Sequence, residues 1–345
     1  MQTELHSTPL APPSWGVDTL VGQVLHGRFQ VLEAVGPSGP ARLYRALHLP
    51  LEREVALRVL SAPLTDQEAR QRFFQEARVA ARLAHPNTVT VLDAGRTDDG
   101  TLYVTQEWLE GRTLAHVLTS GALPWARAVE LARGLGRSLR QAHRRGVVHG
   151  DMTPAYIMLV TDAAGRECSH VKVRGFGRLR PVVAESERLS VPDLTGSGSF
   201  HGAHAYMAPE RARGVADARG DIYSLGVVLF QMLMGRVPFE SEDALELVFA
   251  HHKEPVPGFG ELRPDLAIPA SVEAVVRRCL EKRPEQRFAS MDAVLEALRD
   301  VGVEEDEAAE PVRAMPRAYR TRTAQFVGAL AGFFKYWSRN ARVRE

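Results

Sequence analysis

The chain is poor in cysteine and aromatic residues, nearly neutral, and without a long hydrophobic run. Cys168 and Cys279 are its only cysteines among 345 residues, and neither has a partner at the spacing of a zinc site. We therefore expect two reduced thiols that pack as small apolar side chains. The net charge of +1 gives no overall field that would attract nucleic acid.

Targeting signals are missing as well. Residues 1–16 contain Glu4 and several prolines where a secretory signal would have an apolar centre. No run of 18 or more apolar residues occurs, so no membrane-spanning helix is predicted. These absences favour a cytoplasmic protein.

The order of the periodic segments indicates an α+β fold with two lobes. Residues 1–25 are rich in proline, lack periodicity and predict a flexible leader. Between 26 and 109 the pattern predicts mostly strands, and from 110 to 300 it predicts mostly helices. The clearest predicted strands are 28–32, 41–44, 54–60 and 103–108, and the clearest predicted helices are 66–83, 271–280 and 289–301.

The C-terminal region divides into an acidic linker, 301–312, and a basic tail, 313–345. In the tail, apolar residues recur on one face of a predicted helix: Phe326, Leu330, Phe333, Phe334 and Trp337. This face is compatible with peripheral binding to an anionic membrane, which would place the protein at the inner face of the membrane. It is equally compatible with docking on the folded domain or on a partner protein. Gly328 and Gly332 lower helix propensity, and the basic residues mostly flank the helix, which favours protein docking.

Two segments carry the chemistry of the chain. His149-Gly150-Asp151-Met152-Thr153-Pro154-Ala155-Tyr156 has the frame H-R-D-x-K-P-x-N, and Val171-Lys172-Val173-Arg174-Gly175-Phe176-Gly177 ends in the frame D-F-G. Over residues 27–300 the chain resembles bacterial, eukaryotic-like Ser/Thr protein kinases. The resemblance extends to scaffold positions: a spine of His149 and Phe176, a buried pair of Glu210 and Arg287, and Asp221 as anchor of the catalytic loop. It implies a bilobal protein-kinase-like fold with a small β-rich N-lobe, 26–109, and a larger helical C-lobe, 110–300.

The same resemblance assigns the site residues. It places Asp151 at the catalytic base, and it implies nucleotide contacts for Gly36, Ser38, Gly39, Arg58, Glu76, Gln106, Glu107 and Leu109. Gly36 to Gly39 belong to the phosphate loop, Arg58 stands where the family has lysine, and Glu76 is its helix partner. Gln106 is the gatekeeper, followed by a hinge that contains Glu107 and Leu109.

Several residues that touch phosphate and metal in the family are replaced. Gly175 stands for the metal-binding aspartate and Tyr156 for the metal-binding asparagine, so no metal residue is assigned and Mg²⁺ is not expected. Thr153 replaces the lysine and Gly150 the arginine of the catalytic loop, while Ala203 replaces a threonine of the activation segment. We therefore expect Asp151 to serve as a structural acceptor within its loop.

Some alternatives stay open at this point. The loop at Gly36 is either a nucleotide lid or a plain hairpin, because Ser38 and Ala41 replace two of its glycines. Arg58 and Glu76 form either a phosphate grip or a purely structural ion pair. ATP could bind at the hinge without Mg²⁺, or the pocket could be filled. The activation loop contains Ser186, Ser190, Thr195, Ser197 and Ser199. It is either a substrate of another kinase or a disordered polar loop, and the second is favoured because Gly150 replaces the arginine that would bind a phosphate. The histidines 201, 204, 251 and 252 are expected at the surface.

The functional hypothesis is a catalytically impaired kinase-like protein, a pseudokinase, that acts as a signalling or scaffold module. Its expected partners are an active Ser/Thr kinase or a phosphopeptide-binding protein, with no role for nucleic acid. The alternative is a weakly active Ser/Thr kinase, or another ATP-dependent transferase, that uses Asp151.

Overall fold

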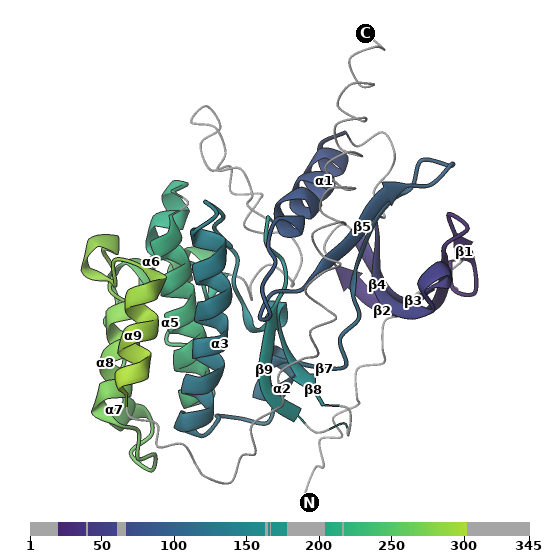
Figure 1. Ribbon diagram of the computed structural model, residues 1–345. Coiled ribbons are helices and arrows are strands. Elements are labelled where there is room, and N and C mark those ends of the chain that lie inside the picture. Colours follow the sequence, from purple (N-terminus) through teal and green to yellow (C-terminus); the bar gives the residue numbers. More distant parts are fainter. Residues whose placement is uncertain are drawn as a thin grey trace, which may run out of the picture.

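The computed structural model describes residues 20–38, 41–60, 67–162, 165, 167–177, 204–215 and 217–301. The predicted leader up to residue 19, the linker and tail after Val301, the activation-loop serines and threonines, Ala203, His201 and Gly39 lie outside the described residues. The side chain of Cys168 does so too. The described part has two lobes, a β-sheet with one helix and a larger group of helices (Figure 1).

The N-lobe is an antiparallel sheet in the order β1-β2-β3-β4-β6-β5. Its strands are β1 (Val24–Leu25), β2 (Phe29–Ser38), β3 (Ala41–His48), β4 (Arg53–Leu60), β5 (Val91–Arg96) and β6 (Leu102–Glu107), with a 3₁₀ turn η1 (Leu49–Leu51) between β3 and β4. The pairing of β1 with β2 lies ahead of residue 26, where the sequence places the start of the domain.

Helix α1 (Gln67–Ala81) packs beside the sheet near β5 (Figure 1). Its buried residues Phe73, Phe74 and Ala77 belong to one apolar cluster with Leu60 and Val104 of the sheet. The spacing of these three residues matches one helical face, which is why residues 66–83 read as a helix in the sequence. That prediction is confirmed.

The C-lobe is built around α5 (Ala218–Met234), which is buried along almost its whole length. Around it lie α2 (Leu114–Leu118), α3 (Trp125–His143), α6 (Ala244–Lys253), α7 (Phe259–Leu262), α8 (Ala270–Cys279) and α9 (Met291–Asp300), with 3₁₀ turns η2 (Pro154–Tyr156), η4 (Pro209–Arg213) and η5 (Pro284–Gln286). The helices predicted at 271–280 and 289–301 are confirmed as α8 and α9. Asp217 caps α5 by accepting a hydrogen bond from the Arg219 N–H, and Gly235 ends it with φ +77°.

A second, three-stranded sheet lies between the lobes and contains the site segments (Figure 1). It consists of β7 (Gly111–Thr113), β8 (Ile157–Thr161) and β9 (Glu167–Val173), in that order. The sequence predicts mostly helices after residue 110, so β8 and β9 are a departure from that expectation. Ile157 and Leu159 alternate with less buried neighbours, which is a strand period in a stretch too short to stand out.

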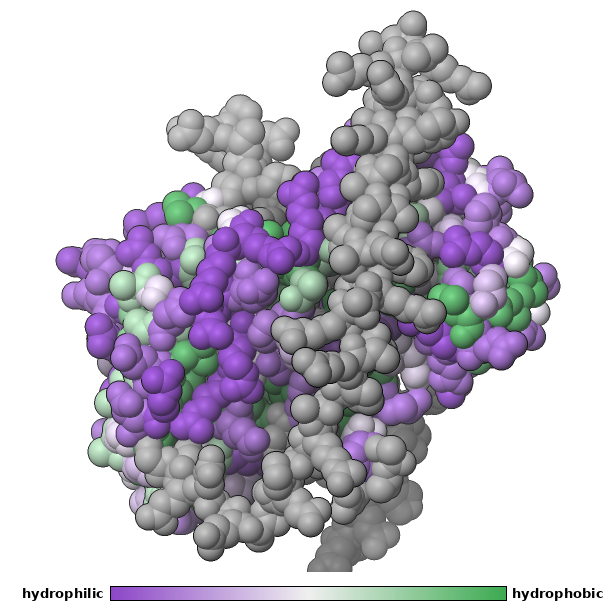
Figure 2. Space-filling view, viewed as in Figure 1, coloured by the Kyte–Doolittle hydropathy of each residue, from purple (hydrophilic) through white to green (hydrophobic). Residues whose placement is uncertain are grey.

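The visible surface is mostly hydrophilic, with a small hydrophobic group at the right edge, over the end of the N-lobe that holds β1 and η1 (Figure 2). Exposed apolar residues of this region are Val21, Val24, Leu49 and Leu51. Among the described residues, no helix combines the length and the apolar character needed to span a bilayer.

Two sequence expectations on single residues have opposite outcomes. Cys279 is buried in the C-lobe core, as expected, and burial raises the pKa of its thiol to about 12. The prediction that His251 lies at the surface is wrong, because only 1% of the residue is exposed. Its Nδ1 lies 2.7 Å from the Tyr223 hydroxyl, and its ring meets Phe239 edge-on. A histidine with one polar partner inside an aromatic group can be a core residue, and helix pattern alone does not reveal that partner.

Candidate functional site

The catalytic-loop segment is held by Asp221, which is fully buried on α5. Its carboxylate accepts hydrogen bonds of 2.8 Å from both the His149 and the Gly150 backbone N–H. His143 Nε2 lies 2.7 Å from the same carboxylate. The predicted role of Asp221 as anchor of this loop is confirmed, and the three contacts satisfy a charge that would be costly if left buried without partners.

His149 joins this loop to the segment after β9. Its ring packs edge-on against Phe176 with centroids 4.9 Å apart, which confirms the predicted spine contact. Its Nε2 donates to the Arg174 carbonyl at 3.0 Å, and its Nδ1 accepts from the Asp151 N–H at 3.3 Å. Both contacts together require the tautomer with the proton on Nε2.

Tyr156 and Gly175 lie in direct contact. A Cβ atom built on Gly175 would be 3.1 Å from Tyr156 Cδ1 and 3.4 Å from its Cγ. Gly175 also has φ +94°, a conformation that residues with side chains rarely adopt. The family resemblance implies metal ligands at these two positions. Residue 156 has an aromatic ring there, and residue 175 has no side chain.

Arg58 of β4 and Glu76 of α1 form the predicted ion pair, with Arg58 Nη2 3.3 Å from Glu76 Oε2. Both side chains are largely buried, and the Arg58 guanidinium also lies over the Phe73 ring at 5.5 Å. The pair ties the helix to the middle of the sheet. Its geometry is that of a structural contact, and a role of Arg58 toward phosphate stays a prediction.

Gly177 holds the start of the activation segment against the same helix. A Cβ on this residue would be 2.9 Å from both Glu76 Cα and Val79 Cβ, and its φ is +87°. Only glycine allows so close an approach in this conformation. The position of Glu76 is therefore set by two contacts, one from β4 and one from the segment that follows Phe176.

The glycine-containing loop is the turn of the β2–β3 hairpin. Gly36 pairs with Leu43 and Ser38 with Ala41, so the ladder continues to the residues that flank the turn. Gly36 has φ +148° next to a register shift. The hairpin is thus observed, while a role of Gly36, Ser38 or Gly39 toward phosphate stays a prediction.

The hinge follows the end of β6, and the structure adds a contact that the sequence analysis missed. Glu107 Oε1 accepts from Lys172 Nζ at 2.6 Å and from the Thr90 N–H at 2.7 Å. The Glu107 side chain is thus used to tie the hinge to β9. Gln106 pairs with Ala56 of β4, and within the described residues the Leu109 N–H makes no backbone hydrogen bond. That N–H is therefore a group that an adenine could use.

Arg174 is a second residue that was missed. Its Nη2 donates to the Ala155 carbonyl at 2.9 Å, and its backbone N–H donates to the Tyr156 carbonyl at 2.9 Å. A positive charge thus lies directly beside Gly175 and the catalytic loop. The signal in the sequence is an arginine immediately before the Gly-Phe-Gly frame, directly after a strand that ends with Val171 and Val173 at alternate positions.

A further family landmark is the pair of Glu210 and Arg287, which is bidentate with distances of 2.6 and 2.8 Å. The Arg287 side chain has no exposed surface and donates to three backbone carbonyls as well, those of Arg219, Glu281 and Lys282. The predicted buried pair is confirmed. It fixes η4 to the segment between α8 and α9.

Comparisons with known proteins agree with this geometry. The protein kinase domain family matches residues 29–298. The chain is 35% identical over 290 residues to the serine/threonine-protein kinase pkn3 of Myxococcus xanthus, covering 83% of this chain and 52% of that protein. It is 34% identical over 276 residues to the serine/threonine-protein kinase PrkC of Bacillus subtilis, covering 79% and 40%.

This chain belongs to the protein kinase family. The crystal structure of the Mycobacterium tuberculosis PknI kinase domain superposes with a TM-score of 0.59 at 26% identity, covering 81% of this chain and 98% of that one. The bilobal kinase fold, with a curled β-sheet N-lobe and a helical C-lobe, is thereby established. The chain spans about half the length, or less, of the curated kinases named above.

Within this kinase domain, the two family positions for Mg²⁺ do not fit the ion. Mg²⁺ prefers carboxylate and amide oxygens in an octahedral arrangement. Gly175 offers no side chain, and the Tyr156 ring covers it. Nor do the described residues contain a group of three or more His, Cys, Asp or Glu side chains placed to hold a metal.

Asp151 is present at the position of the kinase base. Its backbone N–H bonds to His149, but among the described residues no hydrogen bond reaches its carboxylate. The expectation that it acts as a structural acceptor in its loop therefore has no support in the described structure. Thr153, at the position of the family lysine, is buried and brings no charge near it.

Proposed function

We propose that this kinase domain is catalytically impaired and acts as a signalling or scaffold module. The observation that carries the proposal is the contact of the Tyr156 ring with Gly175, at the two positions where a kinase holds its metal ions. Phosphoryl transfer depends on positioning and on cations that neutralise developing charge, with little covalent chemistry from the protein. The residues at these two positions supply neither a ligand nor the space for one.

The size of the effect supports this proposal. Losing one preorganised electrostatic contact typically costs about 2.7–4 kcal/mol of activation free energy. Here both ligand positions and the loop lysine are replaced, by Gly175, Tyr156 and Thr153. Such losses are not additive, but even two of them reduce the rate by several orders of magnitude.

A second candidate is an active Ser/Thr kinase or another ATP-dependent transferase. The relatives favour it, because the proteins matched here are named serine/threonine-protein kinases. Within the described residues the Asp151 carboxylate has no hydrogen-bond partner, so it is available as a base, and Arg58 is paired with Glu76. By themselves the comparisons support this candidate better than impairment, and the proposal of impairment depends on the site residues.

The proposal also includes binding of ATP, the kinds of partner protein and a location in the cell. A nucleotide would reach the hinge at Leu109 and contact Arg58, without Mg²⁺. The partners are an active Ser/Thr kinase or a phosphopeptide-reading protein, which a kinase fold without turnover can hold through its surface. We place the protein in the cytoplasm.

The test is transfer from γ-labelled ATP with Mg²⁺ or Mn²⁺ to the chain itself and to a general acceptor such as casein. Asp151→Asn is the matched variant, since it removes the base but keeps the size of the side chain. The proposal predicts that wild type and variant give the same background incorporation. Incorporation that is at least tenfold higher in wild type would establish the second candidate instead.

A further inference from the structure

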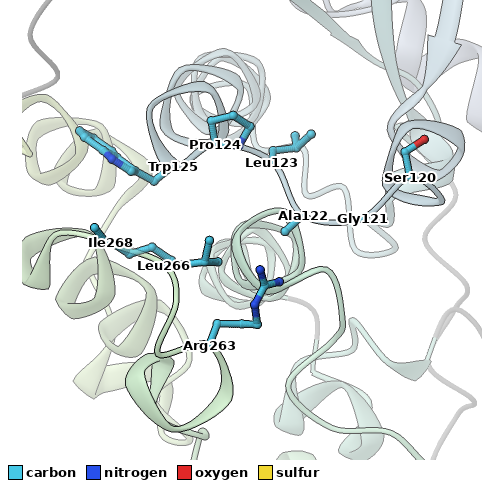
Figure 3. A pocket seen from close by; sticks show the side chains of 10 residues that line it. Ser120, Gly121, Ala122, Leu123, Pro124, Trp125, Arg263, Leu266 and Ile268 are labelled. Carbon is cyan, nitrogen blue, oxygen red and sulfur yellow. The ribbon is translucent and has the colours of Figure 1, made fainter.

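A pocket of about 510 Å³ opens at the end of the C-lobe that is formed by the loop before α3 and the loop between α7 and α8 (Figure 3). The two loops face each other, with Leu123, Pro124 and Trp125 on one side and Leu266 and Ile268 on the other. Pockets that bind ligands usually have volumes of about 300–1,000 Å³, and this pocket lies within that range.

More of the pocket lining is apolar than polar, and the apolar part rests on the core. Leu123, Trp125, Leu266 and Ile268 are partly buried and pack against the main hydrophobic cluster. The Leu123 N–H donates to the Met232 carbonyl at 2.6 Å, which fixes one wall to α5. At the rim the charge of Arg263 is already paired with Asp265, at 2.7 and 2.8 Å. The lining therefore matches an apolar occupant better than a charged one.

The folded chain leaves the C-lobe at this same end. Helices α3 and α9 run antiparallel, because Arg144 pairs with Asp292 at the start of α9 and Arg133 bonds to the Leu298 carbonyl near its end. Since α3 begins at Trp125, Arg133 lies about 12 Å along the helix axis from the pocket wall. The last described residue, Val301, follows α9 directly.

The sequence beyond Val301 contains an apolar face of suitable size. The predicted helical face begins at Phe326, so residues 302–325 form a connection of 24 residues. A chain of that length with random-coil statistics has a root-mean-square span of about 27 Å, which exceeds the roughly 12 Å along the helix axis from Arg133 to the pocket wall. At such short range the effective concentration of the tail at the pocket is on the order of millimolar.

We propose that the apolar face of residues 326–337 docks into this pocket of its own chain. The face contains Phe326, Leu330, Phe333, Phe334 and Trp337. Two or three of these side chains insert between Trp125 and Leu266, and the basic residues that flank the face remain in solvent. The tail is then a C-terminal brace on the C-lobe, and this arrangement is independent of whether the domain transfers phosphate.

Site-specific photo-crosslinking in the full chain tests the proposal. Benzoylphenylalanine replaces Phe333 on the apolar face, or Gly328 on the opposite face as the matched position. From position 333 we expect crosslinks within one chain to residues 120–125 or 263–268, and from position 328 at least fivefold fewer. Crosslinks mainly to the exposed Leu245 and Phe249 of α6, mainly between two chains, or at equal yield from both positions would overturn the proposal.

Hydrogen exchange of the same full chain gives a second readout that needs no crosslinker. Phe333→Asp should make the amides of 120–126 and 263–268 exchange several-fold faster, because the pocket loses its cover. Gly328→Asp adds the same charge on the opposite face and should leave these amides unchanged. Equal exchange in wild type and both variants contradicts the proposal.

The alternative is that the apolar face binds a membrane surface. Repeating the crosslinking experiment with phosphatidylserine–phosphatidylcholine vesicles tests it. Crosslinks from position 333 to the pocket that persist with vesicles support docking. Lipid adducts without pocket crosslinks, with and without salt, would assign the apolar face to the membrane surface and overturn the proposal.

Discussion

The Tyr156 ring covers the backbone of Gly175, so that a Cβ on residue 175 would lie 3.1 Å from the ring. The two residues are 19 positions apart in the sequence, yet they lie in contact. A side chain at residue 175 would press on the ring at 156, and the positive φ of Gly175 favours glycine there as well.

This relationship predicts a strong coupling between the two positions. Gly175→Asp should lower the free energy of unfolding by about 2–4 kcal/mol, since it adds overpacking to an unfavourable positive φ. In a Tyr156→Asn background the same change should cost about 1–2 kcal/mol. Urea denaturation of the four proteins of this cycle measures the coupling, and a coupling below about 0.5 kcal/mol would contradict the contact.

A second prediction concerns the contact of Gly177 with α1. Gly177→Ala should cost the penalty of positive φ plus about 1–3 kcal/mol for the clash with Glu76 and Val79. Gly146→Ala is the matched control, because Gly146 also has positive φ, +69°, but nothing within 4 Å of its added Cβ. Equal losses of stability for the two variants would show that Gly177 does not touch the helix.

The ion pair of Arg58 with Glu76 should contribute to stability. Arg58→Gln should lower the free energy of unfolding by about 1.5–3 kcal/mol, because it leaves a largely buried carboxylate without its charged partner. Arg236→Gln breaks the exposed pair with Glu240 and should cost about 0–1 kcal/mol. Chemical denaturation of both variants makes the comparison, and a smaller loss for Arg58 than for Arg236 would rule out a structural pair.

His251 predicts a pH dependence of stability. Burial lowers its pKa to about 3, and the positive charge of Lys282 and neighbouring His252 and His204 act in the same direction. Between pH 6.5 and about 3 the unfolded chain binds a proton here that the folded chain does not. Stability should therefore fall as the pH decreases through this window, by up to about 1.4 kcal/mol per pH unit from this residue.

The variant His251→Gln isolates this contribution. Unfolding free energies measured from pH 7 to pH 4.5 should show a slope that is shallower than wild type by up to one proton. The comparison is made on slopes, since loss of the contact with Tyr223 lowers the stability of the variant at every pH. Identical slopes would mean that His251 is accessible to protons in the folded state.

The sequence predicted those parts of the site that depend on motif spacing. Asp221, Arg287 and the pair of Arg58 with Glu76 were found because each occupies a fixed place in an ordered set of family positions. Such contacts follow once the fold is known. Of the C-lobe helices, α8 and α9 were predicted individually, because their apolar residues recur at helical spacing.

Contacts between residues that no motif relates could not be predicted. The ion pair of Lys172 with Glu107 joins β9 to the hinge, and nothing in the sequence relates these two residues to each other. The closeness of Tyr156 and Gly175 depends on the backbone angle of Gly175, which sequence does not state. His251 is buried because Tyr223 and Phe239 surround it, and both come from other elements.

The central claim is that no Mg²⁺ ion is held at Gly175 and Tyr156. The most direct measurement is the thermal stabilisation of the full chain by ATP, with EDTA and then with Mg²⁺, over the same range of nucleotide concentrations. Without a metal site, the apparent affinities should agree within about twofold in the two conditions, or ATP should stabilise the chain in neither. Stabilisation that appears only with Mg²⁺, or an apparent affinity at least tenfold tighter with it, would contradict the claim.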